Sequence, residues 1–266
     1  MATVGTIREL LDAEYPPLTA EEWDSVGLIC GDPDATVTTV LCALDPTLDV
    51  VYEALEVGAQ LIVTHHPLFL SGVSTVARDT VGGRVVHEAI AHGIALFNAH
   101  TNADHASPGV SDALAAILGV VNCRPLEPGD SVTTGIGRVG NLEEPMLLSA
   151  FAEHVAATLP HSAAGIRVAG NPDQIISTVA VCGGSGDSLL SIAATMADVY
   201  VTSDLKHHKV LDHPRDVCAL VDVPHFCSEW PWVPMVAALI QERTAGAVSA
   251  VVSTTRTDPW TMHVGL

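Results

Sequence analysis

The feature that most constrains the fold is a regular alternation of short apolar runs with segments of helical periodicity. Residues 37–44 are mostly β-branched and apolar, and residues 47–57 then place apolar side chains at helical spacing before Gly58. The alternation continues with a strand at 61–64, a helix at 83–92, a strand at 94–97 and a helix from about 108 to 118. Strands that alternate with helices predict an α/β fold with a mainly parallel sheet.

The same pattern occurs again in the second half of the chain. Residues 176–197 repeat the strand and helix of 37–58, and residues 199–202 correspond to 61–64. The third strands, 94–100 and 218–225, each end in a histidine that a carboxylate follows four residues later. We interpret this as an internal duplication that produces two similar α/β lobes with mainly parallel or mixed sheets. Chance similarity between apolar strands is the alternative.

The two halves are separated by residues 126–130, which contain a proline and a glycine and are typical of a loop. A strand at 135–140 and a helix at 146–159 are predicted after it. We place the first lobe at 1–127 and the second at 128–266, with C-terminal elements free to pack back on the first lobe.

Composition narrows the class of protein. A hydrophobic content of 48% with 16% charged residues indicates a folded core, and a net charge of −20 repels nucleic acids and anionic membranes. The N-terminal segment carries Arg8, Glu9 and Asp12, which do not fit a secretory signal. Six cysteines without a C-x-x-C pair indicate reduced, buried thiols. We therefore expect a soluble cytoplasmic protein that binds neither membranes nor nucleic acid directly.

Potential metal ligands follow three of the predicted strands. His65 and His66 leave the carboxyl end of the strand at 61–64, which is where open α/β sheets place ligand sites. A His-His pair by itself is more often a surface or hydrogen-bonded feature. Here the third strand of each half is also followed by a histidine and a carboxylate, which are further potential ligands. Carboxylates are able to bridge two cations. The predicted metal ligands are His65, His66, Asp104, His225 and Glu229.

Several motifs occur in a fixed order along nearly the whole chain. They are Trp23-Asp24-Ser25-Val26-Gly27-Leu28, Thr64-His65-His66-Pro67-Leu68, His100-Thr101-Asn102-Ala103-Asp104, Thr202-Ser203-Asp204-Leu205-Lys206-His207-His208, His225-Phe226-Cys227-Ser228-Glu229 and Thr257-Asp258-Pro259. With these motifs the chain resembles the NIF3-like family, some of whose members are called GTP cyclohydrolase 1 type 2 homologues. The resemblance implies a dinuclear site formed by the five predicted ligands, in a cleft between two α/β lobes, and relatives that assemble as toroidal hexamers.

Other histidines and lysines near these motifs allow more than one interpretation. His100 is interpreted as a partner that orients Asp104. For His105 three roles stay open, namely a ligand, a proton shuttle or a solvated side chain. Two interpretations of the cluster around Lys206, His207 and His208 are weighed equally: contact with an anionic substrate, or a solvated helix start.

Two further segments have simpler interpretations. Glu21, Glu22 and Asp24 are expected to form a solvated or helix-capping acidic cluster. The glycine-rich residues 183–186 are expected to form a tight turn from a strand to a helix, because they lack the Lys-Ser/Thr of a phosphate-binding loop.

Metal-assisted hydrolysis is the function that we infer from these residues. Two divalent ions, with zinc, iron, manganese, nickel and cobalt all compatible, would activate a bridging water against a phosphoester or amide-like C–N bond of a small anionic substrate. Glu229 is the expected bridging carboxylate. A non-catalytic metal-binding or metal-delivery protein and a ring-forming regulatory scaffold are the alternatives, so enzymatic activity is left open.

Overall fold

Two mixed α/β units make up the chain in the computed structural model, which describes residues 1–129 and 131–265. The first unit contains Met1–Ala103 and Val233–Thr257, and the second contains Asp104–Trp232 and the chain from Asp258 onward. The units do not divide at the predicted boundary between residues 127 and 128, because β5 (Val120–Pro128) runs through it and pairs with β6 (Gly135–Leu147). Asp130, at the end of the predicted break, lies outside the described residues.

The first unit is built on a five-stranded sheet with the order β1-β4-β3-β2-β11. Its central strands pair in parallel, and β1 pairs antiparallel with β4 at one edge. The strands predicted near 37–44, 61–64 and 94–97 are present as β2, β3 and β4. The strands of this sheet are β1 (Gly27–Cys30), β2 (Thr39–Ala43), β3 (Leu61–Thr64), β4 (Ala95–Asn98) and β11 (Ser249–Val252).

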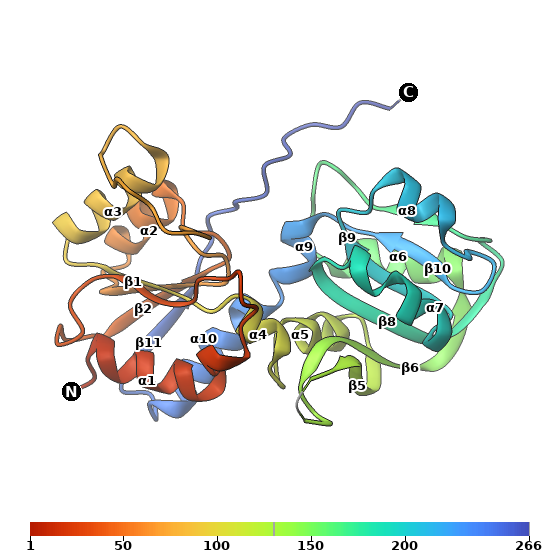
Figure 1. Ribbon diagram of the computed structural model, residues 1–266, viewed down its shortest axis with the longest axis horizontal. Helices are drawn as coiled ribbons and strands as arrows, with labels where there is room; N and C mark the ends of the chain where they lie inside the picture. The colour runs from red at the N-terminus through yellow and green to blue at the C-terminus, as the bar shows by residue number, and fades with distance from the viewer. Residues whose placement is uncertain (130, 266) are drawn as a thin grey trace. The chain divides into compact units, whose positions relative to one another are not determined.

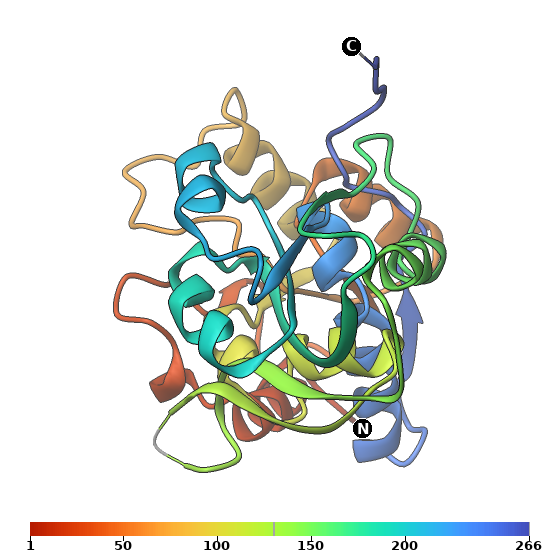
Figure 2. The same cartoon turned by 90° about the vertical axis from the view of Figure 1, so that its right-hand side faces the viewer.

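Helices cover both faces of this first sheet. In Figures 1 and 2, α2 and α3 lie on one side of the strands, and α1 and α10 lie on the other. Threonine side chains accept hydrogen bonds at the first turns of the first three helices, for example Thr47 from the backbone of Val50 in α2. The helices are α1 (Val4–Glu14), the 3-10 turn η1 (Pro17–Thr19), α2 (Leu48–Glu56), α3 (Val81–Ala91) and α10 (Trp232–Arg243).

The second unit is built on a six-stranded sheet with the order β5-β6-β8-β9-β10-β7. Its β8, β9 and β10 pair in parallel, and the remaining neighbours pair antiparallel. Both sheets are therefore mixed. Besides β5 and β6, the strands are β7 (Arg167–Ala169), β8 (Ile175–Ser185), β9 (Val199–Ser203) and β10 (Ala219–Asp222).

The helices of the second unit also lie on both sides of its sheet. In Figures 1 and 2, α7 and α6 lie on opposite sides. Leu190 and Ala193 of α7 pack on Ala180, Tyr200 and Leu220 of the sheet in a buried cluster. The helices are α5 (Val110–Ile117), α6 (Leu148–Thr158), the 3-10 turn η2 (Asp187–Leu189), α7 (Leu190–Met196), α8 (His207–Asp212) and α9 (His225–Glu229).

The two predicted repeats share one arrangement of strands. In the first unit β2, β3 and β4 are consecutive parallel neighbours, and in the second unit β8, β9 and β10 have the same order and direction. This similarity is consistent with an internal duplication, which stays an interpretation. It also means that histidines after β3, β4 and β10 follow the carboxyl ends of parallel strands.

Helix length and cysteine burial relate to two of the expectations from composition. Within the described residues, no helix is both long and apolar enough to cross a membrane. Cys42, Cys182, Cys218 and Cys227 are buried free thiols as expected, but the expectation was wrong for Cys123, which is exposed.

Candidate metal centre

The first unit brings three histidines together at one edge of its sheet. His65 and His66 follow β3, and His100 follows β4. Because Thr64 and Asn98 are register partners at the ends of these parallel strands, the segments leave the sheet side by side. Each histidine offers one ligand nitrogen, and these three atoms lie within 4.8 Å of one another. This edge of the first unit can therefore hold a metal ion.

Each of these imidazole rings is held through Nδ1 by an oxygen acceptor. Nδ1 of His65 contacts the carbonyl oxygen of Ala99 at 2.9 Å, and Nδ1 of His66 contacts Oδ1 of Asp45 at 2.7 Å. Since carbonyl and carboxylate oxygens only accept, Nδ1 carries the proton and the lone pair of the neutral ring lies on Nε2. A metal ion would bind that nitrogen, and this arrangement is common for metal-ligating histidines.

His100 is held in the same way by Asp24. Its Nδ1 donates to Oδ1 of Asp24 at 2.8 Å, and the backbone N–H of Thr101 donates to Oδ2 at 3.0 Å. The Asp24 side chain is fully buried and accepts from the first residue of the helix Thr101–His105, so of the two expected roles capping fits this residue and solvation does not. Burial alone would raise the pKa of Asp24, but hydrogen bonds from Thr101 and His100 outweigh it and lower the pKa. Asp24 therefore stays ionised and fixes His100.

The second unit places His225 and Glu229 on one face of the short helix α9. Nε2 of His225 lies 3.0 Å from Oε2 of Glu229, and its Nδ1 lies 2.7 Å from Oδ2 of Asp204. Burial would raise the pKa of Asp204, but hydrogen bonds from His225 and Ser185 lower it. With Nδ1 donating to Asp204, the short distance between Nε2 and Oε2 requires a proton or another cation between these two atoms. This pair therefore offers one nitrogen and one oxygen ligand.

Glycines in β8 make room for the Glu229 carboxylate. A side chain at Gly184, whose φ is +67°, would overlap that carboxylate and come within 3.3 Å of Cε1 of His225. The backbone N–H of Gly184 donates to Oγ of Ser228 at 2.9 Å, which ties the strand to α9. The expected turn at 183–186 was wrong, because β8 continues to Ser185.

Asp104 and Glu229 both raise the pKa of one buried thiol, that of Cys182. Burial raises the pKa of Cys182 to about 12, and the negative charges of Asp104 and Glu229 contribute to that increase. Both carboxylates therefore lie near Cys182 in the second unit. Asp104 and His105 end the short helix α4 (Thr101–His105), and both are half-buried. The interpretation of His100 as the partner of Asp104 gains no support, since its Nδ1 donates to Asp24.

The basic cluster of the sequence lies at the start of α8. Lys206, His207 and His208 are exposed, and Nζ of Lys206 lies 3.7 Å from Oδ2 of Asp187. The rings of His207 and His208 meet edge to face with centroids 5.1 Å apart. His207 also lines a cavity of the second unit.

Sequence reasoning missed the acceptors that hold the histidines. Asp45 follows β2, Asp204 follows β9 and Asp24 precedes β1, so each is distant in sequence from its partner. The hydroxyl of Thr257 in turn donates to Asp45. The motifs containing Asp24, Asp204 and Thr257 were the available signal, although they did not reveal these contacts.

Comparison with known proteins agrees with the resemblance seen in the sequence. Residues 2–259 match the family Duf34/NIF3 (NGG1p interacting factor 3). The chain belongs to this family. A Streptomyces coelicolor relative named GTP cyclohydrolase 1 type 2 homolog is 47% identical over 99% of this chain and 95% of its own length.

Solved structures of Duf34/NIF3 relatives share the fold. A Bacillus cereus protein related to NIF3 aligns with a TM-score of 0.90 and 26% identity over 99% of both chains. A Staphylococcus aureus protein aligns with a TM-score of 0.90 and 30% identity, covering 98% of this chain and 99% of its own. The two mixed α/β sheets are therefore the architecture of this Duf34/NIF3 protein and its relatives.

The residues of this Duf34/NIF3 protein fit divalent metal ions. The histidine cluster of the first unit provides imidazole nitrogens, and the pair in the second unit adds a nitrogen and a carboxylate oxygen. Nitrogen and oxygen ligands without thiolate suit zinc, iron, manganese, nickel or cobalt. The carboxylates that hold Nδ1 of His66, His100 and His225 are the kind of outer partners that orient metal ligands.

Proposed function

We propose that this Duf34/NIF3 protein binds two divalent metal ions and uses them to hydrolyse a small anionic substrate. The proposed ligands are His65, His66, Asp104, His225 and Glu229, and we add His100 because its ring belongs to the cluster of the first unit. The observation that carries the proposal is the common fixing of Nδ1 in four of these histidines. Such fixing costs conformational freedom and favours metal binding through Nε2.

Burial adds support to the proposal. His65 is completely buried and Glu229 is 4% exposed. Polar side chains are rarely buried unless hydrogen bonds or metal ions compensate for lost hydration. The buried polar ligands next to the strand ends therefore favour a metal centre over a solvated histidine cluster.

The proposed chemistry depends on the positive charge of the ions. Divalent ions lower the pKa of coordinated water and polarise phosphoryl or carbonyl oxygens when they are bound. With a net charge of −20, the chain itself repels an anionic substrate. Glu229 would serve as the bridging carboxylate because its side chain is one methylene longer than that of Asp104, which would hold one ion.

Turnover by the reconstituted protein tests the proposal. Purified protein is loaded separately with Zn²⁺, Mn²⁺, Fe²⁺, Ni²⁺ or Co²⁺ and assayed on phosphoesters, nucleotides and compounds with hydrolysable C–N bonds. GTP belongs in the panel because of the name of the Streptomyces relative. We expect turnover that His65→Ala and Glu229→Ala abolish and that His87→Ala, at an exposed histidine of α3, retains.

The outcomes separate the candidate functions. Equal turnover in the wild type, His65→Ala and Glu229→Ala would reject the site as the catalytic centre. Metal binding without turnover on any substrate would instead support metal storage or delivery. Circular dichroism of each variant shows whether the fold persists.

Assembly is a separate part of the proposal. The family resemblance implies a homohexamer, and exposed apolar side chains such as Val81 and Ile175 are available to an interface. Native mass spectrometry is expected to give the mass of six chains. A monomer at micromolar concentration would contradict this assembly without affecting the metal ligands.

A further inference from the structure

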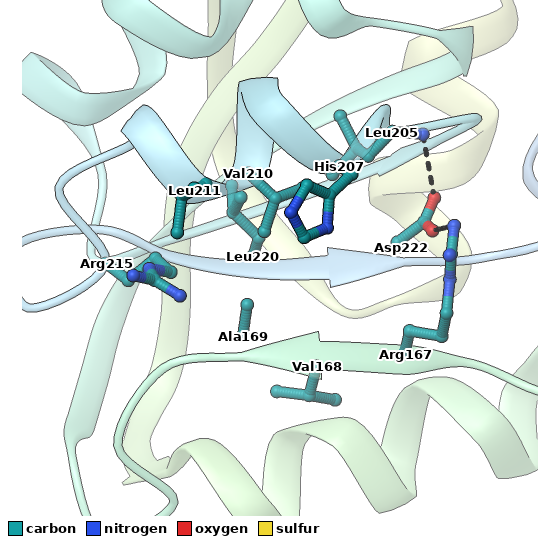
Figure 3. Close-up of a pocket in the computed structure, with 10 residues that line it drawn as sticks. All are labelled: Arg167, Val168, Ala169, Leu205, His207, Val210, Leu211, Arg215, Leu220 and Asp222. Carbon is teal, nitrogen blue, oxygen red and sulfur yellow. Dashed lines mark hydrogen bonds and ion pairs between the residues drawn. The ribbon is translucent and has the colours of Figure 1, made fainter. Parts of the chain in front are cut away.

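A second candidate binding site lies in the second unit, between α8 and the strands β7 and β10. It is a cavity of about 310 Å³, which is near the lower size of known small-molecule sites. Its walls combine apolar and charged side chains from β7, β10, α8 and the segments on either side of α8 (Figure 3). The apolar side chains are Val168, Ala169, Leu205, Val210, Leu211 and Leu220.

Charged groups lie at both ends of this apolar strip. Figure 3 shows Arg215 at one end, the ion pair of Arg167 and Asp222 at the other, and His207 between them. The whole chain has 11 lysines and arginines against 31 acidic residues, so two arginines on one small cavity are a local excess of positive charge. The cavity therefore favours an anion although the chain as a whole repels one.

The two arginines differ in how their charge is compensated. Arg167 pairs with the buried Asp222, which also accepts from the backbone N–H of Leu205. Among the described residues, no carboxylate forms an ion pair with Arg215. Guanidinium groups bind carboxylates and phosphates through paired N–H donors. Arg215 is therefore the group that can bind the charged end of a ligand.

We propose that this cavity binds a small amphipathic carboxylate, with its apolar body on the strip and its carboxylate on Arg215. The apolar walls require an apolar body, and burial of that body supplies most of the affinity. Asp222 lines the same cavity, so a singly charged carboxylate meets less repulsion there than a doubly charged phosphate. His207 adds a ring N–H donor beside the strip.

The location relates this ligand to the candidate metal centre. Arg167 and Asp222 also line a neighbouring cavity of about 250 Å³, whose other walls include Asp204 and His225. A ligand on the apolar strip would therefore contact Arg167 and Asp222, which also line the cavity that contains Asp204 and His225. The site itself uses none of the proposed metal ligands, so it stands independently of the metal chemistry.

Calorimetry with the full chain tests this site, and octanoate is the probe. We expect octanoate to bind, while acetate lacks the apolar body and octylamine has the opposite charge, so both bind much more weakly. Arg215→Gln should weaken octanoate binding about tenfold, because it removes a charge-assisted hydrogen bond to the carboxylate at an exposed arginine. Leu211→Asp, at a side chain that is 53% exposed, should weaken it by adding negative charge to the wall.

The matched control is Lys209→Gln, which removes a positive charge from the same helix at an exposed position outside the cavity. It should bind octanoate as the wild type does. Absence of octanoate binding to the wild type would overturn the proposal, and so would equal affinity in Arg215→Gln. Tighter binding of octyl phosphate than of octanoate would overturn the choice of a carboxylate. Circular dichroism confirms that each variant is folded.

Discussion

Nδ1 of His100 donates to Oδ1 of Asp24 over 2.8 Å, although 76 residues separate the two in sequence. The same kind of contact links His66 to Asp45 and His225 to Asp204. In each pair the carboxylate fixes the orientation and protonation of the ring before any metal ion arrives. The fold therefore contributes to the proposed metal affinity through residues that are not ligands themselves.

Removing one of these carboxylates should weaken metal binding. In Asp24→Asn the amide cannot supply the negative charge that holds His100, so we expect metal affinity to fall about ten- to hundredfold. Titration calorimetry with Zn²⁺ measures the loss. Glu22→Gln removes an exposed carboxylate two residues earlier and should have no effect. Wild-type affinity in Asp24→Asn would show that Asp24 has no positioning role.

A pair of glycine variants separates backbone strain from loss of the site. Gly184 and Gly58 both have φ of +67°, so alanine at either position costs about 1–2 kcal/mol of folding free energy. At Gly58 a new Cβ meets nothing within 4 Å, whereas at Gly184 it overlaps the Glu229 carboxylate. We expect Gly184→Ala alone to lose bound metal, as measured by elemental analysis. Equal metal content in the two variants would refute this role of Gly184.

A buried arginine should be important for the stability of the second unit. Arg138 is 1% exposed, and it donates to both carboxylate oxygens of Asp112 and to the carbonyl oxygen of Ala106, close to Asp104. Arg138→Met leaves Asp112 without this partner, and we expect a loss of about 3–5 kcal/mol in urea unfolding. Arg124→Met, at an exposed arginine of β5, should cost less than about 0.5 kcal/mol. Similar losses in both variants would contradict the account.

Stability at low pH should depend on Glu53. Burial would raise its pKa, but hydrogen bonds from Ser253, Thr254 and Thr255 lower the pKa to about 2 from the ordinary value of 4.5. The ionised carboxylate therefore stabilises the folded state above about pH 4.5, and this contribution disappears as the pH falls toward 2.

The corresponding variant is Glu53→Gln. We expect it to lower the free energy of unfolding by about 1–2 kcal/mol near neutral pH, and by progressively less as the pH falls below 4.5. Glu56→Gln, at an exposed glutamate of the same helix, is the control. Urea unfolding at several pH values measures the difference. A Glu53→Gln effect that does not change with pH would argue against this carboxylate as the cause.

Local sequence patterns were sufficient to predict the strands that precede the histidines. The run at 61–64 is completely buried in β3, and such apolar runs are typical of central parallel strands. β5 was missed because Pro125 and Pro128 resemble a linker, yet an edge strand of a sheet tolerates proline. The same prolines led us to place the boundary between the lobes within this strand.

The site was only partly predictable because its hydrogen bonds join distant segments. His65 and His66 were recognisable from their place after a strand, whereas the role of Asp24 depends on a contact that only folding creates. The fixing of four Nδ1 atoms depends on strand register and loop conformation, which residue spacing does not specify. In the sequence Gly184 resembled a turn residue. A glycine is needed there because a side chain would overlap the Glu229 carboxylate, and residue spacing does not reveal that contact.

Metal stoichiometry tests the central claim most directly. Protein purified without an affinity tag or chelator is analysed by inductively coupled plasma mass spectrometry, beside His87→Ala and the double variant His65→Ala/Glu229→Ala. The account predicts about two divalent ions per chain in the wild type and in His87→Ala, and a sharp fall in the double variant. Wild-type protein that contains no metal and takes up none from added Zn²⁺, Mn²⁺ or Fe²⁺ would contradict it.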